Sequence, residues 1–133
     1  MAAASTWAVS VKGVLIWRDE VILLRNERDE WELPGGRLEA GESPEDCVER
    51  AVEEQLGLFA KAERLLDTWV YDIEGQGSLL IITYGCSVNL PDPLALSEEH
   101  SEVRLFTTND LKSLPLPGGY AASIAAWHRL LAR

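Results

Sequence analysis

The stretch that decides the fold runs from Gly36 to Leu58 and reads GRLEAGESPEDCVERAVEEQLGL. Its first half is a loop bent by glycines, because Gly35, just before it, and Gly41 allow backbone conformations that other residues resist. In its second half Ser43 is placed to cap a helix, with Pro44 at the first helical position. The sequence therefore predicts a glycine-bent loop that leads directly into a helix.

The predicted helix is short and amphipathic. Val48, Val52 and Leu56 recur at helical spacing and form one apolar stripe. Gly57 follows the last of them, and glycine often ends a helix by adopting the left-handed conformation. We therefore expect a helix from about Pro44 to Leu56 that packs its apolar stripe against the core of the protein.

The same stretch resembles the signature of the Nudix family. That signature is a glycine, five residues, a glutamate, seven residues, and then Arg-Glu-hydrophobic-x-Glu-Glu-x-Gly-hydrophobic. The positions that match in register are Gly36, Glu42, Arg50, Val52, Glu54, Gly57 and Leu58. The lead-in WELPGG and the later run from His100 to Pro117 are also similar to small members of the family. A pattern of this length is far more specific than a lone glycine motif. We call residues Gly36 to Leu58 the box.

The order of the predicted elements agrees with the fold that the resemblance implies. Strands are predicted for Trp7–Trp17, Val21–Leu24, Ala62–Ile73, Ser78–Val88 and Val103–Phe106, and a loop for Leu90–Glu99. A closing helix is predicted for Tyr120–Leu131, with Ile124, Trp127 and Leu131 facing the core. We expect an α/β fold with a mixed β-sheet between helices, the α/β/α sandwich of the family. With 133 residues the chain is long enough for a core of its own, and we expect residues 1–133 to form a single Nudix-like domain.

Two positions depart from the family pattern. Ala51 stands where the family has the glutamate after the arginine, and Gln55 stands where it has the second of the paired glutamates. Residues four apart lie on one face of a helix, so both changes fall on the face that holds divalent cations in the family. Magnesium prefers carboxylate oxygens, which alanine lacks, and a glutamine oxygen carries no charge. We therefore expect Mg²⁺ or Mn²⁺ to bind weakly.

The resemblance implies roles for the residues of the box that remain. Glu54 is the best remaining metal ligand and catalytic carboxylate, and Gly35 lends its carbonyl oxygen to the metal. Glu42 joins them at the metal site by holding the loop against the helix, while Arg50 serves catalysis by orienting carboxylates. Without the family, Glu54 and Arg50 form an ordinary pair four residues apart on a solvated helix face.

Further candidates lie outside the box. In the family a loop acid near the last strand often supplies an extra ligand or the base, and Glu99 is the expected one here. Glu98 and Glu102 stay open as alternatives, and so does the role of His100. Among the residues that bind substrate we include Trp31 and Trp69, which are able to stack on a nucleobase, although tryptophans on strands more often pack a core.

The charge of the chain limits its partners. A net charge of -10 argues against a protein that follows nucleic-acid phosphates. A phosphorylated ligand must then meet a metal or a local basic patch. The N-terminus lacks a basic region followed by an unbroken apolar run, so we expect a cytoplasmic protein without a membrane segment. The expected partner is a phosphorylated small molecule, a nucleotide, and a homodimer stays open.

The resemblance implies hydrolysis of a nucleoside diphosphate linked to another group. Water attacks a phosphorus while metal ions neutralise the charge on the phosphoryl oxygens. Because two carboxylates are absent, the first hypothesis is a hydrolase with impaired or atypical metal dependence. The second is a non-catalytic nucleotide-binding or regulatory module on the same fold. The third is a structural protein with a vestigial pocket. A turnover assay on nucleoside di- and triphosphates separates the first hypothesis from the second.

Overall fold

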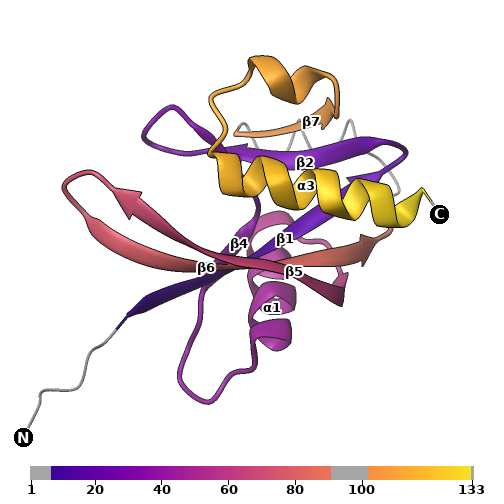
Figure 1. Cartoon of the computed structure of the whole chain (residues 1–133). Coiled ribbons are helices and arrows are strands. Elements are labelled where there is room, and N and C mark those ends of the chain that lie inside the picture. Colours follow the sequence, from indigo (N-terminus) through magenta and orange to yellow (C-terminus); the bar gives the residue numbers. More distant parts are fainter. Residues whose placement is uncertain (1–6, 91–101, 133) are drawn as a thin grey trace, which may run out of the picture.

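A mixed sheet lies between two helices in the computed structural model, which describes residues 7–90 and 102–132. Helix α1 (Pro44–Leu56) lies on one face of the sheet and α3 (Gly118–Leu131) on the other (Figure 1). The remaining elements are β1 (Ala8–Trp17), β2 (Glu20–Arg25), β3 (Trp31–Glu32), β4 (Gly35–Arg37), β5 (Ala60–Ile73), β6 (Gly77–Val88), β7 (Val103–Thr107) and the 3-10 helix η1 (Asp110–Ser113). The predicted α/β/α fold class is confirmed.

Strand β1 is the centre of the sheet, whose main order is β3-β2-β1-β6-β5. It runs parallel to β6 from the pair Ala8 and Leu79 to the pair Leu15 and Cys86. It runs antiparallel to β2 and to β4, and β7 extends the sheet beyond β2. The short strand β4 thus brings the start of the glycine loop directly onto the central strand.

Each face of the sheet carries its own apolar core. Under α1, Val48, Val52 and Leu56 are buried together with residues of β1 and β6, as the stripe predicted. Under α3, Ile124 and Trp127 are buried, and Trp127 lies so close to β6 that a Cβ on Gly85 would be 2.2 Å from its ring. The closing helix was expected to bury Leu131 as well. That expectation is wrong, because Leu131 is the last residue of α3 and is half exposed, while Leu130 packs against the core.

Helix α1 begins and ends where its local signals predict. The Ser43 hydroxyl oxygen accepts a hydrogen bond from the Asp46 backbone nitrogen at 3.1 Å, which caps the first turn. Gly57 adopts a φ of 67° and donates its N–H to the Glu53 carbonyl at 2.8 Å, which ends the helix. Neither α1 nor α3 has the length and apolar character to cross a membrane, and no other described helix does.

The structure differs from the predicted elements mainly at strand ends. Residues Gly35 to Arg37, predicted as part of the loop, form β4 because they pair with Ser10 to Lys12 of β1. Strand β5 begins at Ala60, two residues before its predicted start, since Ala60 pairs with Val88 at the end of β6. The loop predicted from Leu90 to Glu99 lies outside the described residues from position 91 onward.

Candidate functional site

Two glycines at the start of the loop lie in close contact with neighbours on opposite sides. A Cβ on Gly35, which has a φ of +155°, would be 2.1 Å from the Val11 carbonyl oxygen and 2.9 Å from Cδ of Lys12. A Cβ on Gly36 would be 3.1 Å from the methyl group of Ala51 on α1. Strand β4 is therefore packed tightly between β1 and the helix, and the glycines make this approach sterically feasible.

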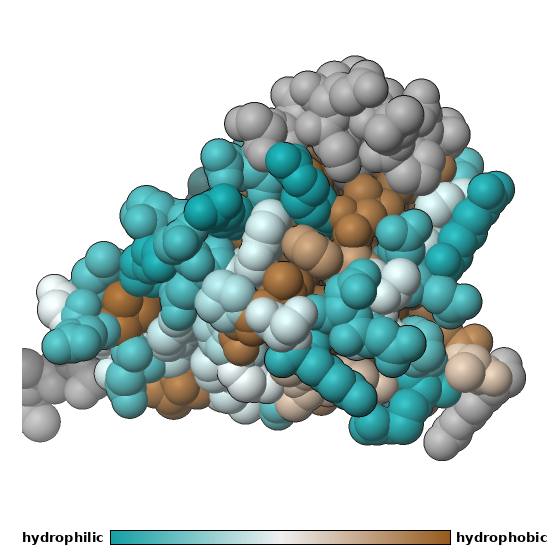
Figure 2. Space-filling view, turned by 90° about the horizontal axis from the view of Figure 1, so that it is seen from above, coloured by the Kyte–Doolittle hydropathy of each residue, from teal (hydrophilic) through white to brown (hydrophobic). Residues whose placement is uncertain are grey.

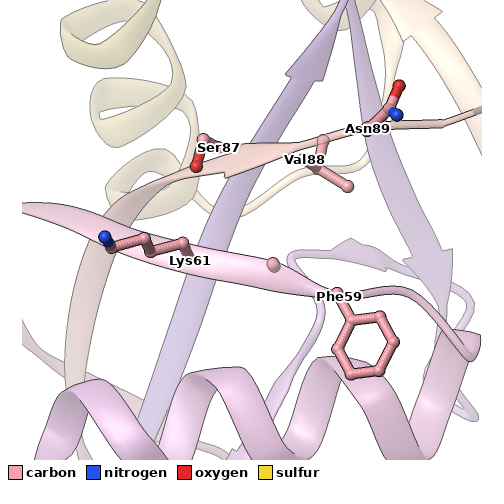
Figure 3. Close-up of a pocket in the computed structure, with 6 residues that line it drawn as sticks. Phe59, Lys61, Ser87, Val88 and Asn89 are labelled. Atoms are coloured by element: carbon pink, nitrogen blue, oxygen red, sulfur yellow. The ribbon is translucent and has the colours of Figure 1, made fainter.

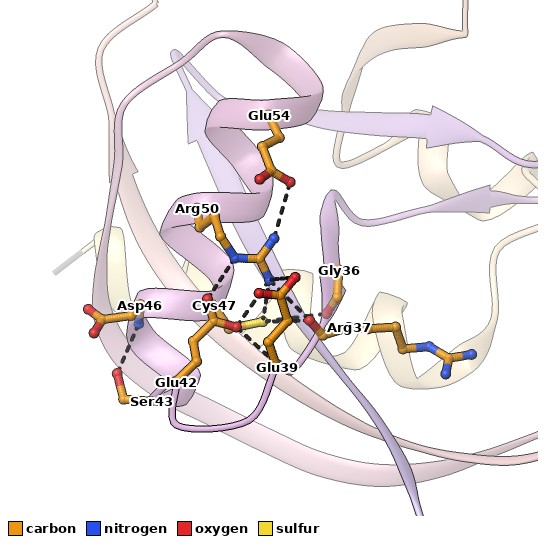
Figure 4. A network of polar contacts seen from close by, with 9 residues as sticks. All are labelled: Gly36, Arg37, Glu39, Glu42, Ser43, Asp46, Cys47, Arg50 and Glu54. Atoms are coloured by element: carbon orange, nitrogen blue, oxygen red, sulfur yellow. Dashed lines mark hydrogen bonds and ion pairs between the residues drawn. The ribbon is translucent and has the colours of Figure 1, made fainter.

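Arg50 joins the loop to α1 through hydrogen bonds on three sides (Figure 4). Its Nε donates to Glu42 Oε2 at 2.6 Å and its Nη2 donates to Glu42 Oε1 at 3.0 Å, so the pair is bidentate. The same Nη2 donates to the Arg37 carbonyl oxygen at 3.1 Å, and Nη1 donates to Glu54 Oε2 at 3.1 Å. Arg50 thus fixes the beginning and the end of the loop onto one turn of helix. We call Arg50 and its contacts with Glu42 and Arg37 the Arg50 latch.

The contact between Arg50 and Glu42 shifts the pKa values of both groups so that each stays charged. Hydrogen bonding from Arg50 lowers the pKa of Glu42 from 4.5 to about 2, and the same bonds raise the pKa of Arg50. Burial, with the hydrogen bond to Glu42, raises the pKa of Cys47 to about 11, so the thiol is neutral at pH 7. The Cys47 thiol donates to the Arg37 carbonyl at 3.4 Å. Cys47 is therefore a buried residue of α1 that packs against the loop.

The depressed pKa of Glu42 makes stability depend on pH in a stated window. A carboxylate whose pKa falls on folding stabilises the fold above its unfolded value of 4.5, and that stabilisation is lost as the pH falls toward 2. We expect the melting temperature of the wild type to fall steeply between these two values. Glu42→Gln should have a lower melting temperature at pH 7 and a flatter acid limb.

The control for this measurement is Glu74→Gln, which removes the same charge from an exposed position in the turn between β5 and β6. It should leave the acid limb of the melting curve as steep as in the wild type. An equally steep acid limb in Glu42→Gln and in Glu74→Gln would contradict the role of the pair with Arg50.

The described residues of the box do not fit a magnesium site built from carboxylates. Ala51 is only 3% exposed and presents a methyl group. The Gln55 side-chain oxygen accepts a hydrogen bond from the Gly35 backbone nitrogen at 2.9 Å. Glu54 is 66% exposed and bound to Arg50. Among the residues that the structure describes, no three His, Cys, Asp or Glu side chains come together to hold an ion.

The candidate residues outside the box are only partly described. Glu98, Glu99 and His100 lie outside the described residues. Glu102 is exposed just before β7, where its backbone carbonyl accepts a hydrogen bond from the Arg25 nitrogen at 2.8 Å. Glu102 therefore faces the end of β2, where Arg25, Asn26 and Glu27 line an open polar hollow with it.

The two candidate tryptophans take part in packing on the α3 side of the sheet. Trp31 meets Phe106 edge to face with ring centroids 4.8 Å apart. Trp69 stacks on Tyr71 at 5.4 Å, and a Cβ on Gly119 would be 2.2 Å from its ring. Its indole nitrogen is buried without a hydrogen-bond partner in the described structure. Stacking of either ring on a base stays a prediction.

Lys12 is the residue near the loop that sequence reasoning missed. It lies on β1 beside Gly35, and its side chain is 9% exposed, with Nζ 3.9 Å from a carboxylate oxygen of Glu32. Burial lowers the pKa of Lys12 from 10.5, while Glu32 counteracts this and the nearby Arg28 and Arg37 add to it. The available signal was a lysine at an inward position of an otherwise apolar strand.

A shallow hollow of about 380 Å³ lies where the chain leaves the box, between the start of β5 and the end of β6 (Figure 3). It is lined by Phe59, Ala60, Lys61, Ser87, Val88 and Asn89, none of which belongs to the loop or its latch. Seen from above, the molecule shows separate hydrophobic patches among hydrophilic residues, and the visible part of that face has no large continuous apolar patch (Figure 2). The loop and its surroundings are therefore the best candidate for a functional site.

A comparison with models of protein families identifies the family of this chain. A sequence model of the NUDIX domain matches residues 7–127, which is most of the chain. The chain belongs to the Nudix family. Nudix proteins act on nucleotide-type substrates and generally use divalent metal ions. The residues that differ from the Nudix signature, Ala51 and Gln55, lie on the helix that carries the metal ligands in the family.

Individual relatives agree with the assignment to the Nudix family. The chain is 28% identical to an ADP-ribose pyrophosphatase of Methanocaldococcus jannaschii, over 80% of the chain and 66% of that protein. It is 38% identical to a MutT-like protein of Streptomyces ambofaciens, over 56% of the chain and 49% of that protein. It thus spans less than two thirds of the length of either relative.

A solved structure confirms the Nudix fold independently. The NUDIX hydrolase from Nitrosomonas europaea superposes with a TM-score of 0.75 at 20% identity, over 93% of this chain and 90% of that one. At this identity the likeness concerns the fold alone.

Proposed function

We propose that this protein is a Nudix-type hydrolase of a nucleoside diphosphate linked to another group, with impaired or atypical dependence on metal. Membership of the family and the name of its relative, an ADP-ribose pyrophosphatase, support the substrate class. The observation that carries the proposal is the Arg50 latch. Arg50 on α1 holds the loop through Glu42 and the Arg37 carbonyl, and Glu54 on the same helix orients Arg50. This is the arrangement a loop needs to stay in a fixed position at a reacting centre.

The box residues divide into two roles in this proposal. Arg50 and Glu42 are positioning residues, since both oxygens of Glu42 already accept hydrogen bonds from Arg50. Glu54 is the carboxylate able to reach an ion, because it is exposed and has one oxygen outside the contact with Arg50. The carbonyl oxygen of Gly35 and the side chain of Glu99 are the further oxygen donors that we assign to such an ion.

The alternative is a non-catalytic nucleotide-binding or regulatory module. A specific observation favours it, because Ala51 and Gln55 are both committed to the packing of β4. Ala51 contacts Gly36, and Gln55 holds the backbone nitrogen of Gly35. A box built in this way keeps its shape without an ion, which suits a protein that binds a nucleotide without cleaving it.

Turnover and metal affinity test the proposal together. We expect slow hydrolysis of at least one nucleoside diphosphate derivative, measured as released phosphate or nucleotide with Mg²⁺ and with Mn²⁺. Calorimetric titration without nucleotide should give weak binding of either ion, because one exposed carboxylate does not offset the dehydration of Mg²⁺. Glu54→Gln should abolish the residual turnover, and the exposed Glu53→Gln serves as the control on the same helix.

The outcomes separate the two functions. No turnover by the wild type on any substrate, together with nucleotide binding, would replace the hydrolase with the binding module. Tight binding of Mg²⁺ would show that residues outside the described part of the chain complete the metal site.

A further inference from the structure

A buried lysine beside the glycine loop needs an explanation other than stability. Lys12 is nearly enclosed, and taking an ammonium ion out of water costs several kcal/mol, which an ion pair rarely recovers in full. A methionine would fill a similar space without this cost. An exposed lysine would make the same ion pair with little loss, but Lys12 lies on the central strand of the sheet. The energetic balance therefore favours a role for the charge itself.

The position of Lys12 connects it to the box. Lys12 pairs with Gly35, the residue before the box, and its stem passes close enough to the Cα of Gly35 to exclude a Cβ there. Gly35 is held from the other side by the Gln55 side chain. The stem of Lys12 thus lies beside Gly35, whose carbonyl oxygen the proposed function assigns to an ion.

The ion pair between Lys12 and Glu32 is not a hydrogen bond. The Nζ of Lys12 lies 3.9 Å from Glu32, which is an ion pair but too long for a hydrogen bond. Glu32 therefore orients the ammonium without using its three N–H donors. The neighbouring carboxylate, Glu30, is bound by Arg28 at 3.0 Å and by the Tyr71 hydroxyl at 3.0 Å, so it is already neutralised.

Arg37 is a second cation near Lys12. Arg28 and Arg37 both act on Lys12 electrostatically, but Arg28 is paired with Glu27 and Glu30. Arg37 pairs with Ser10, two residues before Lys12, so the backbone alternation places both on the same face of the sheet. Lys12 and Arg37 therefore form a small cationic pair beside Glu32, and in a protein of net charge -10 such a pair is what a phosphorylated ligand without a strongly bound metal would have to contact.

We propose that Lys12 binds a phosphate oxygen of the substrate, with Arg37 alongside. These two side-chain cations would then supply the positive charge that metal ions supply in a Nudix box rich in carboxylates. This proposal rests on the proposed function for the class of ligand, a nucleoside diphosphate. It makes Lys12 a substrate-binding residue and predicts that binding does not require a divalent ion.

Binding without metal tests this directly. We would titrate ADP and UDP into the protein in EDTA, with adenosine and uridine as probes that lack phosphate. Lys12→Met should weaken diphosphate binding by at least about tenfold, which is the value of one charge-assisted hydrogen bond. Nucleoside binding should stay unchanged. Lys61→Met, which removes an exposed lysine from β5, is the matched control and should leave both affinities as they are.

Melting curves of each variant show whether it is folded, and Lys12→Arg, which keeps the charge, should retain most of the diphosphate affinity. Equal binding of diphosphates by wild type and Lys12→Met overturns the proposal, as does the absence of diphosphate binding by the wild type in EDTA. An equal loss of affinity for diphosphates and for nucleosides also overturns it, because Lys12 would then contact the base or the sugar.

The two proposals fail separately. If the wild type binds diphosphates through Lys12 but turns over nothing, the hydrolase is wrong and the phosphate site stands. If the wild type is an active hydrolase and Lys12→Met has the same kcat/KM, the phosphate site is wrong and the hydrolase stands.

Discussion

The double change Ala51→Glu and Gln55→Glu should create a protein whose stability and turnover both depend on Mg²⁺. Position 51 is almost fully buried against Gly36, so a carboxylate there is desolvated and lies on the face that carries position 55. Without an ion we expect a loss of about 3 kcal/mol in the free energy of unfolding, the cost of an uncompensated buried charge. Position 55 is less affected, because a glutamate oxygen also accepts the hydrogen bond from Gly35.

Magnesium should restore what the new carboxylates cost. An ion that binds only the folded state adds about 2.7 kcal/mol of stability at one hundred times its dissociation constant. The measurement pairs melting temperatures with and without Mg²⁺ with turnover on the same substrates. We expect the double variant to hydrolyse at least one nucleoside diphosphate derivative well above the wild-type rate.

The matched control makes the same two chemical changes at exposed positions, Ala122→Glu on α3 and Gln76→Glu in the turn after β5. It should show no response to Mg²⁺. A double variant at positions 51 and 55 that gains neither metal-dependent stability nor turnover would mean that the pocket has changed beyond its ligands. A wild type that turns over as fast as the variant would contradict the impairment itself.

Gly35→Ala should be among the most destabilising single substitutions in the chain. The added Cβ would lie 2.1 Å from the Val11 carbonyl oxygen and 2.8 Å from the Lys12 Cα, both of which are backbone atoms of the central strand. Such atoms cannot rotate away, so β4 must separate from β1. We expect a loss of about 3 kcal/mol or more, measured by urea unfolding.

Gly41→Ala separates this steric effect from backbone strain. Gly41 has a φ of +79°, but a Cβ there would meet no atom within 4 Å. Its replacement should therefore cost about 1 kcal/mol, the strain of a left-handed residue alone. Equal losses at positions 35 and 41 would show that the close approach of β4 to β1 does not limit residue 35.

The sequence predicts α1 well because its signals are local. Ser43, Pro44 and Gly57 act on backbone groups a few residues away, and each does so in the structure. Strand β4 was not predicted, because nothing within Gly35 to Arg37 indicates a strand until β1 lies beside it. Short strands depend on partners distant in sequence, and a pattern in one segment does not contain them.

The candidate site shows the same division between local and distant information. The register of the box predicted that Glu42 holds the loop and that Arg50 orients carboxylates, and the two side chains lie in direct contact. It described Gln55 only as a missing ligand. That its oxygen binds the nitrogen of Gly35, twenty residues earlier, follows from the packing of β4 on α1. Likewise, the sequence does not show that Lys12 lies beside Gly35 and Glu32, because these contacts depend on the pairing of β1 with β4.

The parallel pairing of β1 with β6 has a consequence for how the chain folds as it is synthesised. Strand β1 begins at Ala8, and its parallel partner does not end until Val88. While a ribosome is still extending the chain through β5, the apolar stripe of α1 lacks its contacts with the buried residues of β6. Closing so long a segment costs chain entropy before any native contact repays it. The pairing of β1 with β6 is therefore completed only after the residues up to Val88 have left the exit tunnel.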